Sequence, residues 1–141
     1  KVNLADLGYG YTELLPIILQ IAVSAQKNHK LLLIEEPESN LHPNYQSQLA
    51  ELFIHASYIF GLNFIIETHS EYMIRKNQVL VAERKFSYPE KQRIFFFEPD
   101  SIYQINFSSD GKMDKKFGAG FFDESHQNAI KLYQINSKSD E

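Results

Sequence analysis

The chain has 141 residues, of which 14 are basic and 18 acidic, and its formal net charge is -4. This balance excludes the uniformly basic surface of many nucleic-acid-binding domains, and the 43% hydrophobic content predicts one globular domain or part of one. The absence of cysteine excludes disulfides and thiolate metal sites, and no apolar stretch is long enough to span a membrane. We therefore expect a cytoplasmic protein without a membrane partner.

The first predicted element is a glycine-containing loop that leads into a helix. The loop covers Asp6–Thr12, and the helix is expected from Leu14 to about Ala25, with Thr12 as its N-cap and Pro16 near its first turn. Glycines let the backbone approach an anion closely, and the start of a helix presents N–H groups and a partial positive charge. This arrangement predicts an anion-contacting loop at the beginning of the helix.

A run of four large apolar residues, Leu31–Ile34, predicts a strand that is covered on both faces, as in a parallel sheet. Pro37 argues against a helix because the residue before a proline favours extended conformations. The adjacent carboxylates of Glu35 and Glu36 come directly after the strand. Because ligands of open α/β sheets bind beyond the carboxyl ends of the strands, these two side chains lie where chemistry is expected.

A second strand, Leu62–Ile66, follows a helix expected from Pro43 to about Tyr58, and Ser70 is placed to cap the next helix. Strand, helix, strand and helix in this order predict a parallel sheet with helical crossovers. The inward-facing helix positions are expected at apolar residues with helical spacing: Leu49, Leu52, Phe53, Ala56, Met73, Ile74, Val79 and Leu80.

The C-terminal part of the chain has a different pattern. Aromatic and β-branched runs at Arg93–Phe97 and Ile102–Phe107 predict a β-hairpin, and an amphipathic helix is expected to end near Gln134. The predicted fold class is therefore α/β, a parallel sheet flanked by helices with a C-terminal β-hairpin and a terminal helix. Three segments are expected: a lobe that carries the sheet at 1–91, a part that completes the same domain at 92–134, and a flexible tail at 135–141.

The polar residues that follow the two strands form the candidate site. Because neighbouring parallel strands end at the same edge of a sheet, we expect convergence of Glu35, Glu36, His42, Glu67 and His69. One carboxylate at such an edge can hold a divalent metal through oxygen, while another takes a proton from an attacking water. A histidine across the site can contact a phosphoryl group.

Three segments resemble motifs of ABC-type ATPases. LLLIEEPESNLHP resembles the Walker B strand and the D-loop, and IIETHS resembles the segment of the switch histidine. LADLGYGYTELLP resembles the divergent signature loop of RecF/SMC-like and OLD-like AAA ATPases, which are associated with DNA repair and phage defence, and GAGFFDE resembles the C-terminal region of one subgroup. The resemblance implies a partial P-loop NTPase fold with ATP and Mg²⁺ as cofactors.

The resemblance also implies roles for the residues at these positions. Glu35 would hold Mg²⁺, Glu36 would be the general base for the attacking water, and His69 would contact the γ-phosphate. Glu35 stands where the family usually has aspartate, so the metal-binding side chain is slightly longer.

A head-to-tail dimer around ATP is a further implication of the resemblance. Gly8, Tyr9 and Gly10 would contact the nucleotide held by a second copy of the protein. Asn40 and His42 would lie on the D-loop, between the two nucleotide sites. Gly8 replaces the usual serine of the signature loop, so one hydroxyl contact is lost and only backbone donors remain.

The 141 residues contain no GxxxxGK[ST] phosphate-binding loop, so we do not expect the chain to bind ATP tightly by itself. We expect the phosphate loop on an upstream segment or on another chain, and we expect this chain to be a piece of a longer protein. ATP hydrolysis by the assembled protein would then act on DNA or on an effector such as a nuclease.

Two other functions stay open. The two histidines and the carboxylates of the candidate site would also suit a metal-dependent hydrolase or nuclease. The non-catalytic alternative is a regulatory module that docks a partner through the hairpin, although some of its apolar residues are expected to cover the sheet. The residues concerned are Phe95, Phe96, Phe97, Ile102 and Tyr103.

Overall fold

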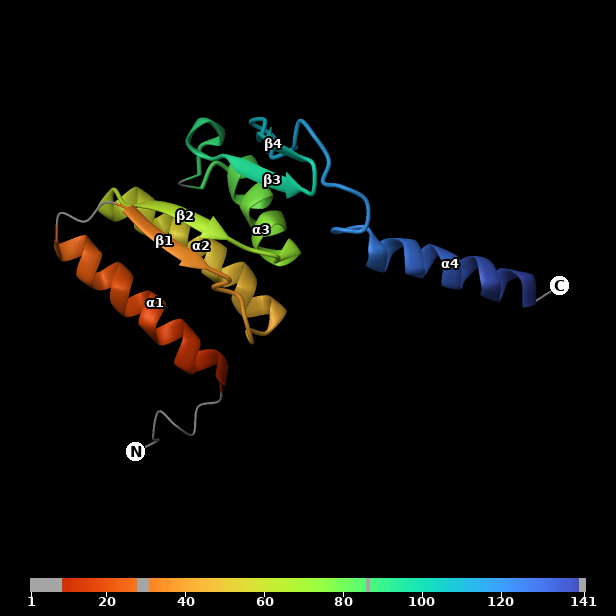
Figure 1. Cartoon of the computed structure of the whole chain (residues 1–141), viewed down its shortest axis with the longest axis horizontal. Helices are drawn as coiled ribbons and strands as arrows, with labels where there is room; N and C mark the ends of the chain where they lie inside the picture. The colour runs from red at the N-terminus through yellow and green to blue at the C-terminus, as the bar shows by residue number, and fades with distance from the viewer. Residues whose placement is uncertain (1–8, 28–30, 86, 140–141) are drawn as a thin grey trace.

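The structure is a computed structural model that describes residues 9–27, 31–85 and 87–139. The elements follow in the order α1 Tyr9–Gln26, β1 Leu31–Glu35, α2 Pro43–Phe60, β2 Asn63–Glu67, α3 Glu71–Ala82, the 3-10 turn η2 Pro89–Lys91, β3 Ile94–Glu98, β4 Ser101–Ile105 and α4 Glu124–Ser139. β1 and β2 form a parallel pair beside helices, and β3 and β4 form an antiparallel hairpin that precedes α4 (Figure 1). This arrangement confirms the predicted α/β fold class.

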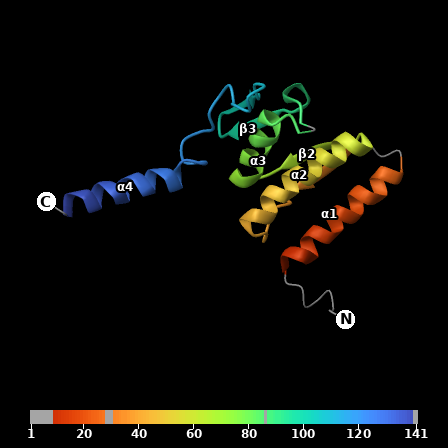
Figure 2. The ribbon, with the colours of Figure 1, turned by 180° about the vertical axis from the view of Figure 1, so that it is seen from behind.

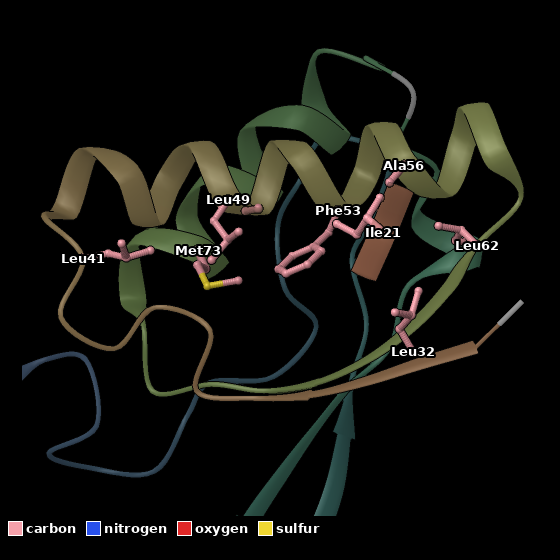
Figure 3. Packing of buried hydrophobic residues seen from close by; sticks show 9 residues of the cluster. Ile21, Leu32, Leu41, Leu49, Phe53, Ala56, Leu62 and Met73 are labelled. Carbon is pink, nitrogen blue, oxygen red and sulfur yellow. The ribbon is translucent and has the colours of Figure 1, made fainter. Parts of the chain in front are cut away.

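The hydrophobic core lies on one face of the parallel pair. β1 and β2 pair in register from Leu31 opposite Asn63 to Glu35 opposite Glu67, and α2 lies over them (Figure 3). The buried members of the core come from α1, α2, α3, the sheet and the connecting turns: Ile21, Leu32, Leu41, Leu49, Ala50, Phe53, Ala56, Leu62 and Met73.

The opposite face of the sheet is exposed in the described part of the chain. Leu33 is 73% exposed, and Leu31 and Ile65 on the same face are also largely exposed. Successive residues of a strand point to opposite faces, and the helices α1, α2 and α3 all contribute to the core on the other side. The prediction of a strand covered on both faces is therefore wrong for these residues.

The helix α1 begins earlier than the sequence predicts. It starts at Tyr9, so Thr12 is inside the helix rather than its N-cap, and Pro16 is an interior residue. Gly10 lies in the first turn, where an added Cβ would be 3.2 Å from the carbonyl oxygen of Asn40. The glycine therefore serves close packing and not a turn. Gly8 lies outside the described residues.

The helices α2 and α3 begin where the sequence predicts them. Pro43 is the first residue of α2, and Gly61 ends the helix with a left-handed backbone of φ 65°. Ser70 caps α3, because its Oγ accepts a hydrogen bond from a backbone N–H of the first turn at 3.1 Å. One inward position on α3 is predicted wrongly, since Val79 is 47% exposed and Val81 is buried instead.

The aromatic residues of the hairpin divide into a packed and an exposed group. β3 and β4 pair on either side of the turn at 99–100, as predicted. Phe96 and Tyr103 pack together with ring centroids 5.4 Å apart, whereas Phe95, Phe97 and Ile102 are exposed. The docking of a partner on the exposed residues stays a prediction.

The helix α4 projects away from the rest of the described chain in both views (Figure 1 and Figure 2). Its described side chains, at 124–137, are all exposed. It continues to Ser139 instead of ending near Gln134, because no glycine or proline interrupts it, so the predicted tail at 135–141 is helical as far as it is described. The predicted domain division at residue 91 stays a prediction. Within the described ranges, no helix is long and apolar enough to cross a membrane.

Gly111 connects the segment after the hairpin to α3. Its backbone has φ 77°, and a Cβ added to it would lie 2.2 Å from the carbonyl oxygen of Gln78. The carbonyl oxygen of Gly111 accepts a hydrogen bond from Nε2 of Gln78 at 2.9 Å. The left-handed backbone and the close approach both require a residue without a Cβ.

We expect Gly111→Ala to lower the free energy of unfolding by about 2–4 kcal/mol, because the substitution adds a steric clash to the cost of a left-handed alanine. The matched control is Gly120→Ala, since Gly120 has φ 83° and no atom within 4 Å of an added Cβ. Gly120→Ala should lower the free energy of unfolding by only about 1–2 kcal/mol. Urea unfolding of both variants measures the difference, and equal losses would contradict the close approach.

Candidate functional site

Three polar side chains meet at the carboxyl ends of β1 and β2. Glu36, Glu67 and His69 each offer a ligand atom, and these atoms lie within 4.8 Å of one another. Nε2 of His69 is 3.2 Å from Oε1 of Glu67 and 3.7 Å from Oε1 of Glu36. All three side chains are more than half exposed, so they can reach a ligand from solvent. We call these three residues the rim cluster.

The parallel register builds the rim cluster. Glu35 pairs with Glu67 at the last position of the two strands, and the backbone N–H of Glu36 donates to the carbonyl oxygen of Glu67 at 3.0 Å. The side chains at the ends of β1 and β2 and directly after them are thereby held at one edge of the sheet. The resulting concentration of carboxylates favours a cation, and carboxylate oxygens are the ligands that Mg²⁺ and Ca²⁺ prefer.

A depression in the surface lies beside the rim cluster. The helix α1 and the edge of the sheet form its two walls. Its lining residues are Thr12, Glu13, Pro16, Ile17, Ile34, Glu35, Glu36, Pro37, Ser39 and Glu67. The predicted metal ligand Glu35 is thus in the depression, although it is not a member of the rim cluster.

Glu36 has an unusual backbone conformation. Its φ is 41°, in the left-handed region, whereas the residue before Pro37 was expected to be extended. The carbonyl oxygen of Glu36 accepts from the N–H of Ser39 at 3.0 Å, and its Oε2 accepts from Oγ of Ser39 at 3.1 Å. These two bonds and the ladder bond to Glu67 hold the strained residue in place. Such strain costs about 1–2 kcal/mol and is concentrated at functional sites.

Glu38 holds the backbone of His69 in the rim cluster, and sequence reasoning missed it. It is 8% exposed, and its Oε1 accepts a hydrogen bond from the backbone N–H of His69 at 2.6 Å. Its Oε2 is buried and has no hydrogen-bond partner in the described part of the chain. A glutamate in a turn after a strand is usually solvated, so the sequence offered no signal that would have identified it.

His42 does not join the rim cluster. Its Nδ1 accepts a hydrogen bond from the backbone N–H of Asn44 at 3.3 Å, so the side chain caps α2. The predicted convergence of five residues is therefore wrong for His42, which takes part in a local capping interaction instead. Its predicted role at the nucleotide stays a prediction.

The turn after β1 contacts the beginning of α1. Asn40, with φ 57°, donates from Nδ2 to Oε1 of Glu13 at 2.8 Å. Gly10 packs against the same turn, where an added Cβ would lie 3.2 Å from Asn40 and from Leu41. The first turn of α1 and the segment that resembles a D-loop are thus side by side. The predicted nucleotide contacts of Tyr9, Gly10 and Asn40 are not tested by this arrangement, and Gly8 is outside the described residues.

A comparison with protein families gives the relationship of the chain. A family model described as an AAA ATPase domain matches residues 1–74, slightly more than half of the chain. The chain belongs to the AAA ATPase domain family. The matched range includes α1, the parallel pair and every residue of the rim cluster, so an AAA ATPase domain supplies the candidate site. No curated protein and no solved structure matches the chain significantly.

Membership in the AAA ATPase domain family supports an ATPase-type function and the use of ATP and Mg²⁺ in general terms. It also agrees with the partial P-loop NTPase fold expected from the sequence. The match ends at residue 74, so the hairpin and α4 lie outside it.

Proposed function

We propose that this chain supplies the catalytic edge of an ATPase and, assembled with a phosphate-binding loop, hydrolyses ATP with Glu36 as the general base. The observation that carries the proposal is the rim cluster, which joins Glu36 and His69 at the ends of two parallel strands inside the family match. A carboxylate and a histidine so placed can act together on one phosphoryl group.

The proposed chemistry assigns one task to each side chain. Glu36 accepts a proton from the attacking water, and the hydroxyl of Ser39 fixes the other oxygen of the same carboxylate. His69 contacts the γ-phosphate from the opposite side of the rim cluster, and Glu67 orients its ring through the contact at 3.2 Å.

The donors at this edge suit Mg²⁺, because they are carboxylate oxygens and the ion prefers hard oxygen ligands. Glu35 is the proposed ligand of Mg²⁺, next to the carboxylates of Glu36 and Glu67. When bound, Mg²⁺ would neutralise charge on the transferred phosphoryl group.

The proposed assembly is a head-to-tail dimer in which each copy completes the nucleotide site of the other. Gly8, Tyr9 and Gly10 would face the nucleotide of the second copy, with Asn40 and His42 between the two sites. The phosphate loop would come from a segment outside these 141 residues. The exposed apolar face of the sheet favours the presence of such a segment, because parallel sheets are normally buried on both faces and the segment would cover this one. We place the activity in RecF/SMC-like or OLD-like systems of DNA repair or phage defence, with DNA or a nuclease as the effector.

We expect ATP hydrolysis by the assembled protein to depend on Mg²⁺. Removal of the ion with EDTA should abolish phosphate release, and excess Mg²⁺ should restore it, because the phosphates carry charge that the carboxylates alone repel. The 141-residue chain without the phosphate loop is the control and should release no phosphate. The absence of Mg²⁺-dependent release from the assembled protein would overturn the proposed function.

A metal-dependent hydrolase or nuclease is the second candidate, because the rim cluster includes a histidine as well as two carboxylates. Elemental analysis distinguishes the two functions. A stoichiometric transition metal that survives dialysis, together with nuclease activity that persists without ATP, would favour the second candidate over the ATPase.

A further inference from the structure

An aromatic cluster outside the family match lies against the rim cluster. It consists of Phe96 on β3 and three residues that precede α4, Phe117, Phe121 and Phe122, which we call the phenylalanine cluster. Five of the six pairs of these rings are in contact, with centroids 4.3 to 5.4 Å apart. The ring of Phe121 also lies 6.4 Å from the ring of His69, with 59° between the two planes.

Phe121 therefore joins the C-terminal segment to the proposed catalytic histidine. The separation and tilt are in the range of attractive aromatic pairs. Phe121 is itself fixed by Phe96 at 4.9 Å and by Phe122 at 4.3 Å, so its ring presents a supported surface.

His69 needs such a support because its side chain is 66% exposed. Glu38 holds only its backbone N–H, and the carboxylates of Glu36 and Glu67 approach only Nε2. Among the described residues, Phe121 is the aromatic residue whose ring contacts the ring of His69.

We propose that Phe121 is a positioning residue, which holds the ring of His69 with Nε2 toward the carboxylates and so links the segment before α4 to the catalytic edge. As a statement about catalysis, this rests on the proposed function. α4 begins three residues after Phe121, so a ligand or partner that moves α4 would also move the support of His69.

The first experiment observes the contact directly in the 141-residue chain. With ¹³C-labelled histidine, the ring protons of His69 are assigned from the signals missing in His69→Gln. Nuclear Overhauser contacts between His69 and the ring of Phe121 are expected, and Phe121→Leu should shift the His69 signals. Tyr133→Leu is the control, because Tyr133 is a 75% exposed aromatic residue of α4 and no ring contact joins it to His69 or to the phenylalanine cluster among the described residues. A His69 spectrum that is identical in the wild type and Phe121→Leu would overturn the proposal.

The second experiment measures ATP hydrolysis by the assembled protein. Phe121→Leu should lower kcat about 3- to 10-fold with KM for ATP unchanged, Phe121→Tyr should keep the wild-type kcat, and the exposed-residue control Tyr133→Leu should leave it unchanged. In a His69→Ala background, Phe121→Leu should have no further effect. An unchanged kcat in Phe121→Leu, or an equal loss in both backgrounds, would overturn the positioning role. If the wild type hydrolyses no ATP, the proposed function fails, whereas the NMR contact still decides whether Phe121 orients His69.

Discussion

Replacing Glu36 with glutamine is expected to reduce ATP turnover by the assembled protein about 10²- to 10⁴-fold, the usual contribution of a general base. The amide has nearly the same size as the carboxylate but cannot accept a proton from water. ATP binding should therefore persist, and the variant should accumulate the ATP-bound dimer. Phosphate release measures turnover, nucleotide retained after gel filtration measures binding, and the elution volume reports the dimer.

Glu90→Gln is the matched control, since Glu90 is an exposed glutamate on η2 that belongs neither to the rim cluster nor to the depression. It should leave turnover unchanged. Undiminished hydrolysis in Glu36→Gln would show that another group takes the proton. Glu36→Gly separates chemistry from backbone strain, because it removes the carboxylate but suits a φ of 41°.

Replacing Glu38 with alanine is expected to lower the free energy of unfolding by about 1–3 kcal/mol, because the partly buried N–H of His69 loses its acceptor. The loss should extend to ATP turnover, since the backbone of His69 would no longer be fixed. Urea unfolding and phosphate release measure the two effects.

Glu38→Gln provides the comparison, because its amide oxygen can still accept the hydrogen bond while the buried negative charge is removed. Glu38→Gln should lower the free energy of unfolding less than Glu38→Ala does. Equal losses in the two variants would mean that the charge of Glu38, and not its bond to His69, stabilises the turn.

The order of elements could be predicted because local chemistry determines it. Pro43 suits the first position of a helix, and Ser70 caps α3 through its hydroxyl. Each of these effects acts within a few residues, so it can be predicted from the local sequence. The parallel pairing followed from the alternation of strands and helices, and that pairing brings Glu36 and His69 together.

The parts that could not be predicted depend on tertiary contacts. Gly10 suggested a turn, but its missing Cβ instead lets α1 pack on the turn after β1. Glu38 resembled a solvated turn residue until its bond to His69 was known. The contact of Phe121 with His69 joins residues far apart in the chain, and no local pattern encodes it. The same holds for His42, whose ring caps its own helix and not the shared site.

The uncovered face of the parallel pair has a consequence for handling the protein. Leu31, Leu33 and Ile65 place apolar side chains on the surface of a sheet that has only two strands in the described chain. Strand edges with unpaired backbone groups beside an apolar surface are templates for pairing with another molecule. We therefore expect the 141-residue chain to self-associate through this face at high concentration. A soluble preparation would need a low protein concentration or a segment that covers the face.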